Sequence, residues 1–176
     1  MMRALRWSGA GLLWVVAILG ALSGALFLAH LAGWVQPLVV VSGSMQPSIN
    51  RGDLLITMPV DVGDVDIGEV ATLPSAASDT LVTHRVTSIG REGDTYVIEM
   101  AGDANQAVDP QPYLVEADAT VLQPMLTVPA IGNVVLLLAR PAVAIPLGVA
   151  VLALIAFSLV PAGRSEEAPV TAEEPA

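Results

Sequence analysis

The chain contains neither cysteine nor lysine, and each absence removes a class of chemistry. Without cysteine there can be no disulfide bond and no thiolate metal site. Without lysine, a mechanism that uses a neutral amine as general base is closed. Histidine is also scarce, since only His30 and His84 occur. The candidate bases for any catalytic reaction are therefore very few.

Basic residues are also few, and acidic residues dominate the middle of the chain. The 176 residues include 7 arginines and 17 acidic residues, which gives a formal net charge of −10. Residues 36–138 hold thirteen of the acids and three of the arginines. Because nucleic-acid binding requires basic side chains that neutralise phosphates, this balance argues against a nucleic-acid partner.

Charged residues are missing from a long stretch near the N-terminus. Residues 11–35 are almost wholly apolar, and 25 residues are enough to cross a bilayer core of about 30 Å as a helix. The composition agrees, because 54% of the residues are hydrophobic and the mean hydropathy is +0.69. Trp7 and Trp34 flank the stretch at about the spacing of the two membrane interfaces. We expect a transmembrane helix, with His30 lying near one interface as a neutral residue.

Two arginines precede this stretch and indicate its orientation. Arg3 and Arg6 make residues 1–10 positively charged, and the positive-inside rule then places them in the cytoplasm. The competing interpretation is a signal peptide that is cleaved near Ala21-Leu22-Ser23. The apolar stretch is longer than the apolar region of an ordinary signal peptide, which favours an uncleaved anchor.

A second apolar stretch lies near the C-terminus. Residues 141–160 carry no charge and again have a spanning length, and Pro146 could kink such a helix. Residues 131–139 fit an amphipathic helix that leads into it along the membrane surface. The tail, residues 165–176, is rich in Glu, Ala and Pro, and we expect it to be disordered. Residues 36–138 would then form a domain on the extracytoplasmic side.

The middle of the chain has the pattern of short β-strands. Runs rich in β-branched residues alternate with Gly, Asp and Pro, without a helical period or an internal repeat. The expected strands are residues 54–58, 68–73, 81–89 and 95–100. Residues 90–94 predict a hairpin loop between the last two strands. The predicted fold class is an all-β domain flanked by two transmembrane α-helices.

Closely spaced serines follow the first apolar stretch. The segment is Ser42-Gly43-Ser44-Met45-Gln46-Pro47-Ser48, in which glycine and proline favour a sharp, rigid turn. Such a turn can present one hydroxyl as a nucleophile and aim nearby donors at a developing oxyanion. Taken alone, the segment is more simply interpreted as an ordinary loop.

The second candidate is the histidine in the predicted strand 81–89. In a strand, Val82, His84 and Val86 share one face, whereas Thr83 and Arg85 share the other. A histidine between two valines is partly desolvated, which favours the neutral imidazole that a general base needs. The alternative is a core histidine bonded to a backbone carbonyl.

Two carboxylates, Asp103 and Asp109, follow in one loop. Either could orient His84 and stabilise its protonated form, as the acid of a serine triad does. The alternatives are an Asx-type turn and a calcium loop, although the ligand spacing does not fit an EF-hand. We expect neither a metal nor another cofactor.

Together, four segments resemble the sequence boxes of type I signal peptidases of the endoplasmic-reticulum and archaeal type, which also occur in some Gram-positive bacteria. These segments are Ser42–Ser48, Arg51-Gly52-Asp53-Leu54, Thr83-His84-Arg85-Val86, and Gly102-Asp103-Ala104-Asn105 with Asp109-Pro110. They occur in family order within residues 36–130, between two apolar stretches that match the family's layout. In this branch a histidine replaces the lysine of the common bacterial enzymes, which agrees with the absence of lysine here.

The resemblance implies a role for each matched residue. Ser44 would be the nucleophile and His84 the general base. The backbone N–H of Ser44 and the hydroxyl of Ser42 would donate to the oxyanion. The final box holds two aspartates. We favour Asp109 as the partner that orients His84, with Asp103 ordering the loop or supporting the dyad.

The resemblance also implies the activity. The chain would be a multi-pass serine endopeptidase of the cell membrane that removes signal peptides from exported precursors without a cofactor. Its partners would be those signal peptides and the lipid bilayer. The alternative is a non-enzymatic, membrane-anchored β-domain that scaffolds envelope proteins, which would explain the apolar stretches but not the four boxes in family order.

Overall fold

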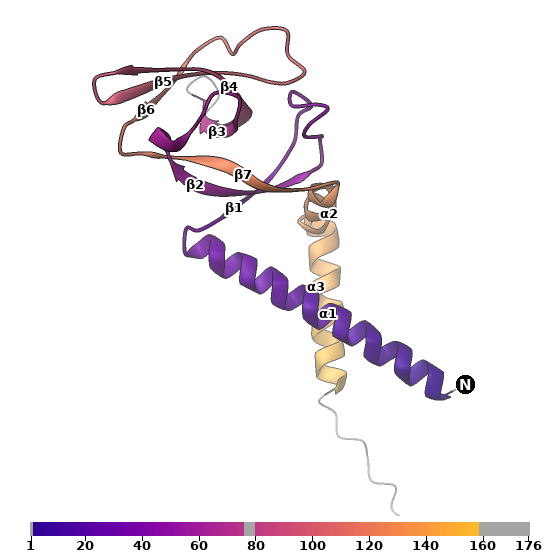
Figure 1. Cartoon of the computed structure of the whole chain (residues 1–176). Helices are drawn as coiled ribbons and strands as arrows, with labels where there is room; N and C mark the ends of the chain where they lie inside the picture. Colours follow the sequence, from indigo (N-terminus) through magenta and orange to yellow (C-terminus); the bar gives the residue numbers. More distant parts are fainter. Residues whose placement is uncertain (1, 76–79, 159–176) are drawn as a thin grey trace, which may run out of the picture. The chain divides into compact units, whose positions relative to one another are not determined.

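The structure is a computed structural model that describes residues 2–75 and 80–158 (Figure 1). In chain order the elements are α1 (Met2–Leu31), β1 (Gln36–Val39), β2 (Leu54–Asp61), the 3₁₀-helix η1 (Val62–Asp64), β3 (Val70–Pro74), β4 (Leu81–Glu92), β5 (Thr95–Ala101), β6 (Tyr113–Glu116), β7 (Thr120–Val128), α2 (Ile131–Leu138) and α3 (Pro141–Ser158). The chain divides into two compact units, of which the first ends at Leu136 and the second contains α3.

The described strands form one antiparallel sheet. Their order is β1-β2-β7-β3-β4-β5-β6, so β7 lies between β2 and β3 although it is the last strand in sequence. The sheet curls, and side chains from β3, β4, β5, β6 and β7 meet in a single core cluster (Figure 1). An all-β domain was expected, and the structure is mainly β.

The predicted hairpin is present, but its loop is shorter than expected. Pairing between β4 and β5 continues to Glu92 opposite Thr95, so only Gly93 and Asp94 form the turn. Gly93 has a φ of 62°, a conformation that glycine adopts at low cost in tight hairpin turns. The five-residue loop predicted at residues 90–94 is therefore wrong in length.

Two clusters of buried side chains make up the core. The larger cluster includes Leu73, Val86, Ile98, Met100 and Val121 from four different strands. The smaller cluster consists of Met45, Ile49 and Leu55, with Leu38, Val40 and Val70 packed against it. The smaller cluster belongs mainly to the loop between β1 and β2 and to the strands on either side, which positions the candidate serine.

The helices only partly match the predicted spans. Helix α1 ends at Leu31, four residues before the end of the predicted span 11–35, and α3 contains Pro146 in its interior. Within the described residues, no single helix meets the length and hydropathy expected of a membrane span. Within α1, Ala17–Leu31 is a shorter apolar helical segment. Ile131–Leu138 and Pro141–Ala153 reach the length and hydropathy of a span only as a pair, and this pair is bent by 77° at the break. The predicted tail, residues 165–176, lies outside the described residues.

Candidate active site

Ser44 lies in the loop between β1 and β2, and the core fixes this loop. Met45 and Ile49 are only 3% and 5% exposed and pack against Leu55 on β2. Burying an apolar side chain of this size contributes roughly 1.5–3 kcal/mol. The Ile49 N–H also donates to the Met45 carbonyl oxygen at 2.9 Å, which closes one tight turn. The backbone next to Ser44 is therefore held by tertiary packing.

The segment after β5 packs closely against the serine loop. The Ala104 N–H donates to the Ser44 carbonyl oxygen at 2.8 Å. A Cβ atom on Gly102 would lie 2.5 Å from the same carbonyl oxygen and 3.0 Å from the Ser44 Cβ. Glycine alone permits this approach, because any side chain would collide with backbone. Gly102 thus brings the loop with the two aspartates against the loop with the serines.

The Ser44 hydroxyl lies within hydrogen-bonding distance of two side chains. Its Oγ is 3.0 Å from Nε2 of His84, which lies 40 residues further along the chain. The Oγ of the exposed Ser42 lies 3.3 Å from the Ser44 Oγ. The structure therefore brings together both serines and the histidine that were singled out in the sequence.

His84 is a buried residue of β4, where it pairs with Ala71 on β3. Its Nδ1 lies 2.7 Å from Oδ2 of Asp109. Because a carboxylate can only accept, Nδ1 carries the proton and donates it in this bond. The neutral ring then has its lone pair on Nε2, which accepts the hydrogen bond from the Ser44 hydroxyl. Ser44, His84 and Asp109 form one continuous hydrogen-bonded series.

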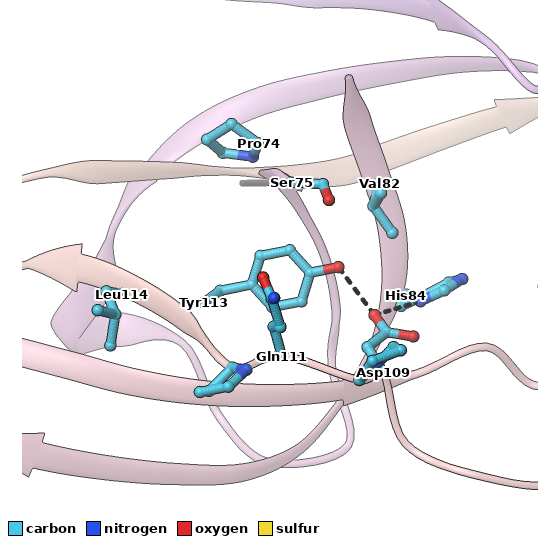
Figure 2. A pocket seen from close by; sticks show the side chains of 10 residues that line it. Pro74, Ser75, Val82, His84, Asp109, Gln111, Tyr113 and Leu114 are labelled. Carbon is cyan, nitrogen blue, oxygen red and sulfur yellow. Dashed lines mark hydrogen bonds and ion pairs between the residues drawn. The ribbon is translucent and has the colours of Figure 1, made fainter. Parts of the chain in front are cut away.

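Asp109 is oriented by its own backbone and by a tyrosine. Its N–H donates to the Met100 carbonyl oxygen at 2.8 Å, which holds the loop against the end of β5. The Tyr113 hydroxyl donates to Oδ2 of Asp109 at 2.8 Å. Figure 2 shows the tyrosine hydroxyl and the His84 ring approaching the same carboxylate. Burial and the neighbouring carboxylate raise the pKa of Tyr113, so its hydroxyl stays protonated and donates.

Asp103 binds a different partner. Its carboxylate accepts two hydrogen bonds from Arg85, at 2.8 Å from Nε and 2.7 Å from Nη2, and a further one from the Ser48 hydroxyl. His84 and Arg85 are consecutive on β4 and point to opposite sides of the strand, so the two aspartates serve opposite sides. The bonds from Arg85, followed by that from Ser48, hold the pKa of Asp103 below its usual range against the opposing effect of burial.

We expect Asp103→Asn to destabilise the fold at neutral pH but not in acid. A carboxylate whose pKa is lowered by folding adds stability above its unfolded pKa of about 3.9, and this stability is lost as pH falls through the folded value. The Arg85 side chain is 37% exposed, so solvent screening limits the loss to about 0.5–1 kcal/mol.

The measurement is denaturant unfolding of the wild type and Asp103→Asn at pH 7 and about pH 2. Asp118→Asn is the control, because it removes the same charge from an exposed turn. A difference between wild type and Asp103→Asn that persists unchanged in acid would contradict the ion-pair explanation.

The Arg-Gly-Asp segment has a structural role at the end of the serine loop. The buried Asp53 carboxylate accepts hydrogen bonds from the backbone N–H of Asn50 at 2.8 Å and of Ala130 at 3.0 Å. The same carboxylate therefore ties the serine loop to the residue that precedes α2. Gly52 has a φ of 91°, and the Asn133 side chain occupies the space that a Cβ would need.

An apolar groove opens beside the serine and the histidine. It has a volume of about 360 Å³, and both Ser44 and His84 line it. Its other walls include Leu38, Val40, Met45, Ile49, Leu81 and Val82. A second cavity of about 580 Å³ lies beside Asp109 and Tyr113 and also touches His84 (Figure 2). Among the described residues, no group of three or more His, Asp or Glu side chains could hold a metal ion.

The sequence did not indicate a role for Tyr113, the bond from Ser48 to Asp103, or the partner of Arg85. Tyr113 begins a strand that the pattern of residues did not predict, so nothing indicated that it would face the core. Arg85 was placed correctly on the strand face opposite His84, but its pairing with Asp103 depends on how the loop after β5 folds back. The only available signal was the proximity in sequence of Tyr113 to Asp109.

Comparisons with known proteins give a consistent relationship. No known protein-family profile matches the chain. Signal peptidase I W of Bacillus subtilis is 39% identical over 74 residues, which are 42% of this chain and 38% of that protein. The signal peptidase complex catalytic subunit SEC11 of Colletotrichum graminicola is 30% identical over 112 residues, or 60% of this chain and 65% of that protein. The human putative signal peptidase complex catalytic subunit SEC11B is 30% identical over 82 residues, covering 47% and 49%.

These three relatives are all named as signal peptidases or their catalytic subunits. The chain is therefore related to the signal peptidase I family. It spans between 38% and 65% of the length of these relatives.

Proposed function

We propose that this chain is a membrane-bound serine endopeptidase that removes signal peptides from exported precursors. The observation that carries the proposal is the hydrogen-bonded series from Ser44 through His84 to Asp109, beside an apolar groove. The relationship to signal peptidases supports the same reaction class. Neither a metal nor an organic cofactor is needed for this chemistry.

In the proposed reaction, His84 takes the proton of Ser44 while the serine Oγ attacks the carbonyl carbon of the scissile bond. Asp109 keeps the proton on Nδ1 and stabilises the imidazolium that forms. The protonated ring then donates its proton to the leaving amine, and an acyl-enzyme on Ser44 remains. A water molecule, activated by the neutral His84, hydrolyses the acyl-enzyme and frees the serine.

The developing oxyanion needs donors next to the nucleophile. We assign this role to the backbone N–H of Ser44 and the hydroxyl of Ser42. The distance of 3.3 Å between the two serine oxygens supports this assignment, because a substrate carbonyl bonded to Ser44 would lie within reach of both donors. Donors fixed before the reaction stabilise the transition state without further reorganisation.

The groove limits which substrates fit. It is small and mainly apolar, so it suits small uncharged side chains near the cut rather than bulky or charged ones. The Ala-x-Ala-like residues that precede the cut in signal peptides have this character. We propose that such residues occupy the groove while their carbonyl group meets Ser44.

We further propose that the β-domain lies on the extracytoplasmic side of a membrane, held by residues 11–35 and 141–160. The apolar composition of α1 and α3 supports this layout. Ser44 follows the end of α1 by only thirteen residues, so an anchored chain would keep it near the membrane surface. A signal peptide held in the same membrane would then meet the site at high effective concentration.

Cleavage of a purified precursor tests the proposal. The full chain in detergent micelles is mixed with a signal-bearing precursor, and the products are identified by mass spectrometry. We expect one cut, after a small residue at the end of the signal peptide. A precursor in which that residue is replaced by a bulky charged one should resist cleavage. An intact precursor after prolonged incubation with the wild type would count against the proposal.

The two aspartates should differ in their effect on the rate. We expect Asp109→Asn to lower kcat by about 10³ to 10⁴, because an amide can donate to His84 and favour the wrong tautomer. Asp103→Asn should lower kcat by no more than about tenfold, since Asp103 contacts Arg85 and Ser48 instead. Each variant is the matched control of the other in the same precursor assay. A larger loss in Asp103→Asn would reverse the assignment.

A further inference from the structure

Tyr113, at the start of β6, lies next to the proposed catalytic series but has no part in the proposed reaction. It is 9% exposed, and its ring lies in the core cluster together with Ile98 and Met100. A buried side-chain donor is most often bonded to a backbone carbonyl, but the Tyr113 hydroxyl is not. It donates instead to Oδ2 of Asp109, the oxygen that also accepts from His84.

We propose that Tyr113 is a positioning residue for the proposed reaction, and that it acts through the Asp109 carboxylate to fix the tautomer of His84. This inference rests on the proposed function only for its effect on the rate. The arrangement of Tyr113, Asp109 and His84 has a physical consequence for the imidazole whether or not a substrate is cleaved.

The two hydrogen bonds together fix a side chain that one bond would leave loose. The last torsion of an aspartate has a broad energy minimum, so a single donor leaves the carboxylate free to rotate over a wide range. A carboxylate oxygen has two lone pairs, and here His84 Nδ1 at 2.7 Å and the Tyr113 hydroxyl at 2.8 Å use them from two directions. Rotation of the carboxylate would break both bonds at once.

Backbone hydrogen bonds to β5 hold Tyr113 and Asp109 in fixed positions relative to each other. Tyr113 is paired with Ile98 in the β5–β6 ladder, and Asp109 is bonded to Met100 two residues further along β5. The residues between them include Pro110 and Pro112, whose rings fix φ and restrict the residue before each one. The donor and the acceptor are therefore both attached to β5 by a short, stiff connection.

The charge state of the tyrosine suits this role. Burial, followed by the hydrogen bond and the charge of Asp109, raises the pKa of Tyr113, so the hydroxyl remains a neutral donor throughout the physiological pH range. Of the other nearby groups, Ser44 contacts His84 at Nε2, and the Asp103–Arg85 ion pair lies on the opposite side of β4. None of these contacts Nδ1, so the proton on that nitrogen depends on Asp109.

The first test is kinetic and uses Tyr113→Phe, which keeps the ring in the core and removes only the hydroxyl. We expect kcat to fall about tenfold while KM changes less than about twofold, because substrate binding in the groove does not involve this side chain. The matched control is Tyr96→Phe, which removes a hydroxyl from the only other tyrosine of the chain. Its kcat should stay within about twofold of the wild type. An unchanged kcat in Tyr113→Phe overturns the proposal.

The second test reads the imidazole directly and does not need activity. The full chain carrying His30→Gln has His84 as its only histidine, so ¹⁵N NMR of the labelled imidazole in detergent micelles reports one ring. We expect the Nδ1–H tautomer in this background and in Tyr96→Phe, and a mixture of the two tautomers in Tyr113→Phe. A purely structural role of the hydroxyl would lower stability without changing the tautomer, so an unchanged tautomer overturns the proposal.

The two tests also separate this inference from the proposed function. If the wild type leaves every precursor intact, the peptidase assignment fails, and the tautomer comparison alone decides the role of Tyr113. If the wild type cleaves and the tautomer does not respond to Tyr113→Phe, the peptidase assignment stands and the positioning role fails.

Discussion

Replacing Ser44 by alanine is expected to abolish precursor cleavage, with kcat reduced by a factor of about 10⁴ to 10⁶. The substitution removes the atom that would form the acyl-enzyme, and Ser42 cannot take its place, because the Ser44 Oγ is the hydroxyl bonded to His84. The variant should fold normally, since the packing of the loop depends on Met45 and Ile49 rather than on the serine hydroxyl.

The measurement is cleavage of a signal-bearing precursor by protein purified from a host whose own signal peptidase has been removed. Ser88→Ala is the control, because it deletes a hydroxyl on β4 four residues beyond His84 and about 13 Å along the strand. Full processing by Ser44→Ala would exclude the serine mechanism, and equal loss in both variants would indicate misfolding.

Replacing His84 by alanine is expected to have an effect of the same order, about 10⁴ to 10⁶ on kcat. The chain has no lysine that could act as base instead, and none of the bonds to Ser44 Oγ found within the described residues involves another titratable side chain. The matched control is His30→Ala, which removes the only other histidine. His30 contacts the Val35 carbonyl oxygen near the end of α1, so its loss should leave kcat within about twofold.

The wild-type rate should also decrease towards acidic pH, because a protonated imidazole cannot accept a proton from the serine. Histidine is the side chain that normally changes charge between about pH 5 and 8. A rate that stays constant down to about pH 4, or activity retained by His84→Ala, would contradict the role of His84 as general base.

The strands that could be predicted are those whose pattern is local. β4 and β5 alternate β-branched residues and are joined by a glycine-containing turn, so their own sequence is enough to indicate a hairpin. β7 contains Pro124, which normally argues against a strand inside a sheet. The structure accommodates the proline at a bulge, where the register between β2 and β7 shifts between Ile56 and Thr57. Such an accommodation depends on the partner strand and cannot be deduced from the strand itself.

The site shows the same division between local and long-range information. The residue types and the resemblance indicated Ser44 and His84, but not the distance between them, because 40 residues separate them. Asp103 and Asp109 lie in one loop, and their sequence context does not distinguish their partners. The path of the chain gives the two aspartates different partners. The backbone of Asp109 is bonded to Met100 on β5, and its carboxylate reaches His84. Asp103 lies beside Arg85 on the other side of β4.

The close contact between the loop after β5 and the serine loop has a consequence for folding. The bond from the Ala104 N–H to the Ser44 carbonyl joins residues sixty positions apart, and contacts of such long sequence separation tend to form late because of their loop-closure entropy. A chain in which β4 and β5 have paired but this contact is missing does not yet hold Ser44 next to His84. Under the proposed function, the ability to cut a peptide would therefore arise only at this final docking step, and a partly folded chain would be inactive.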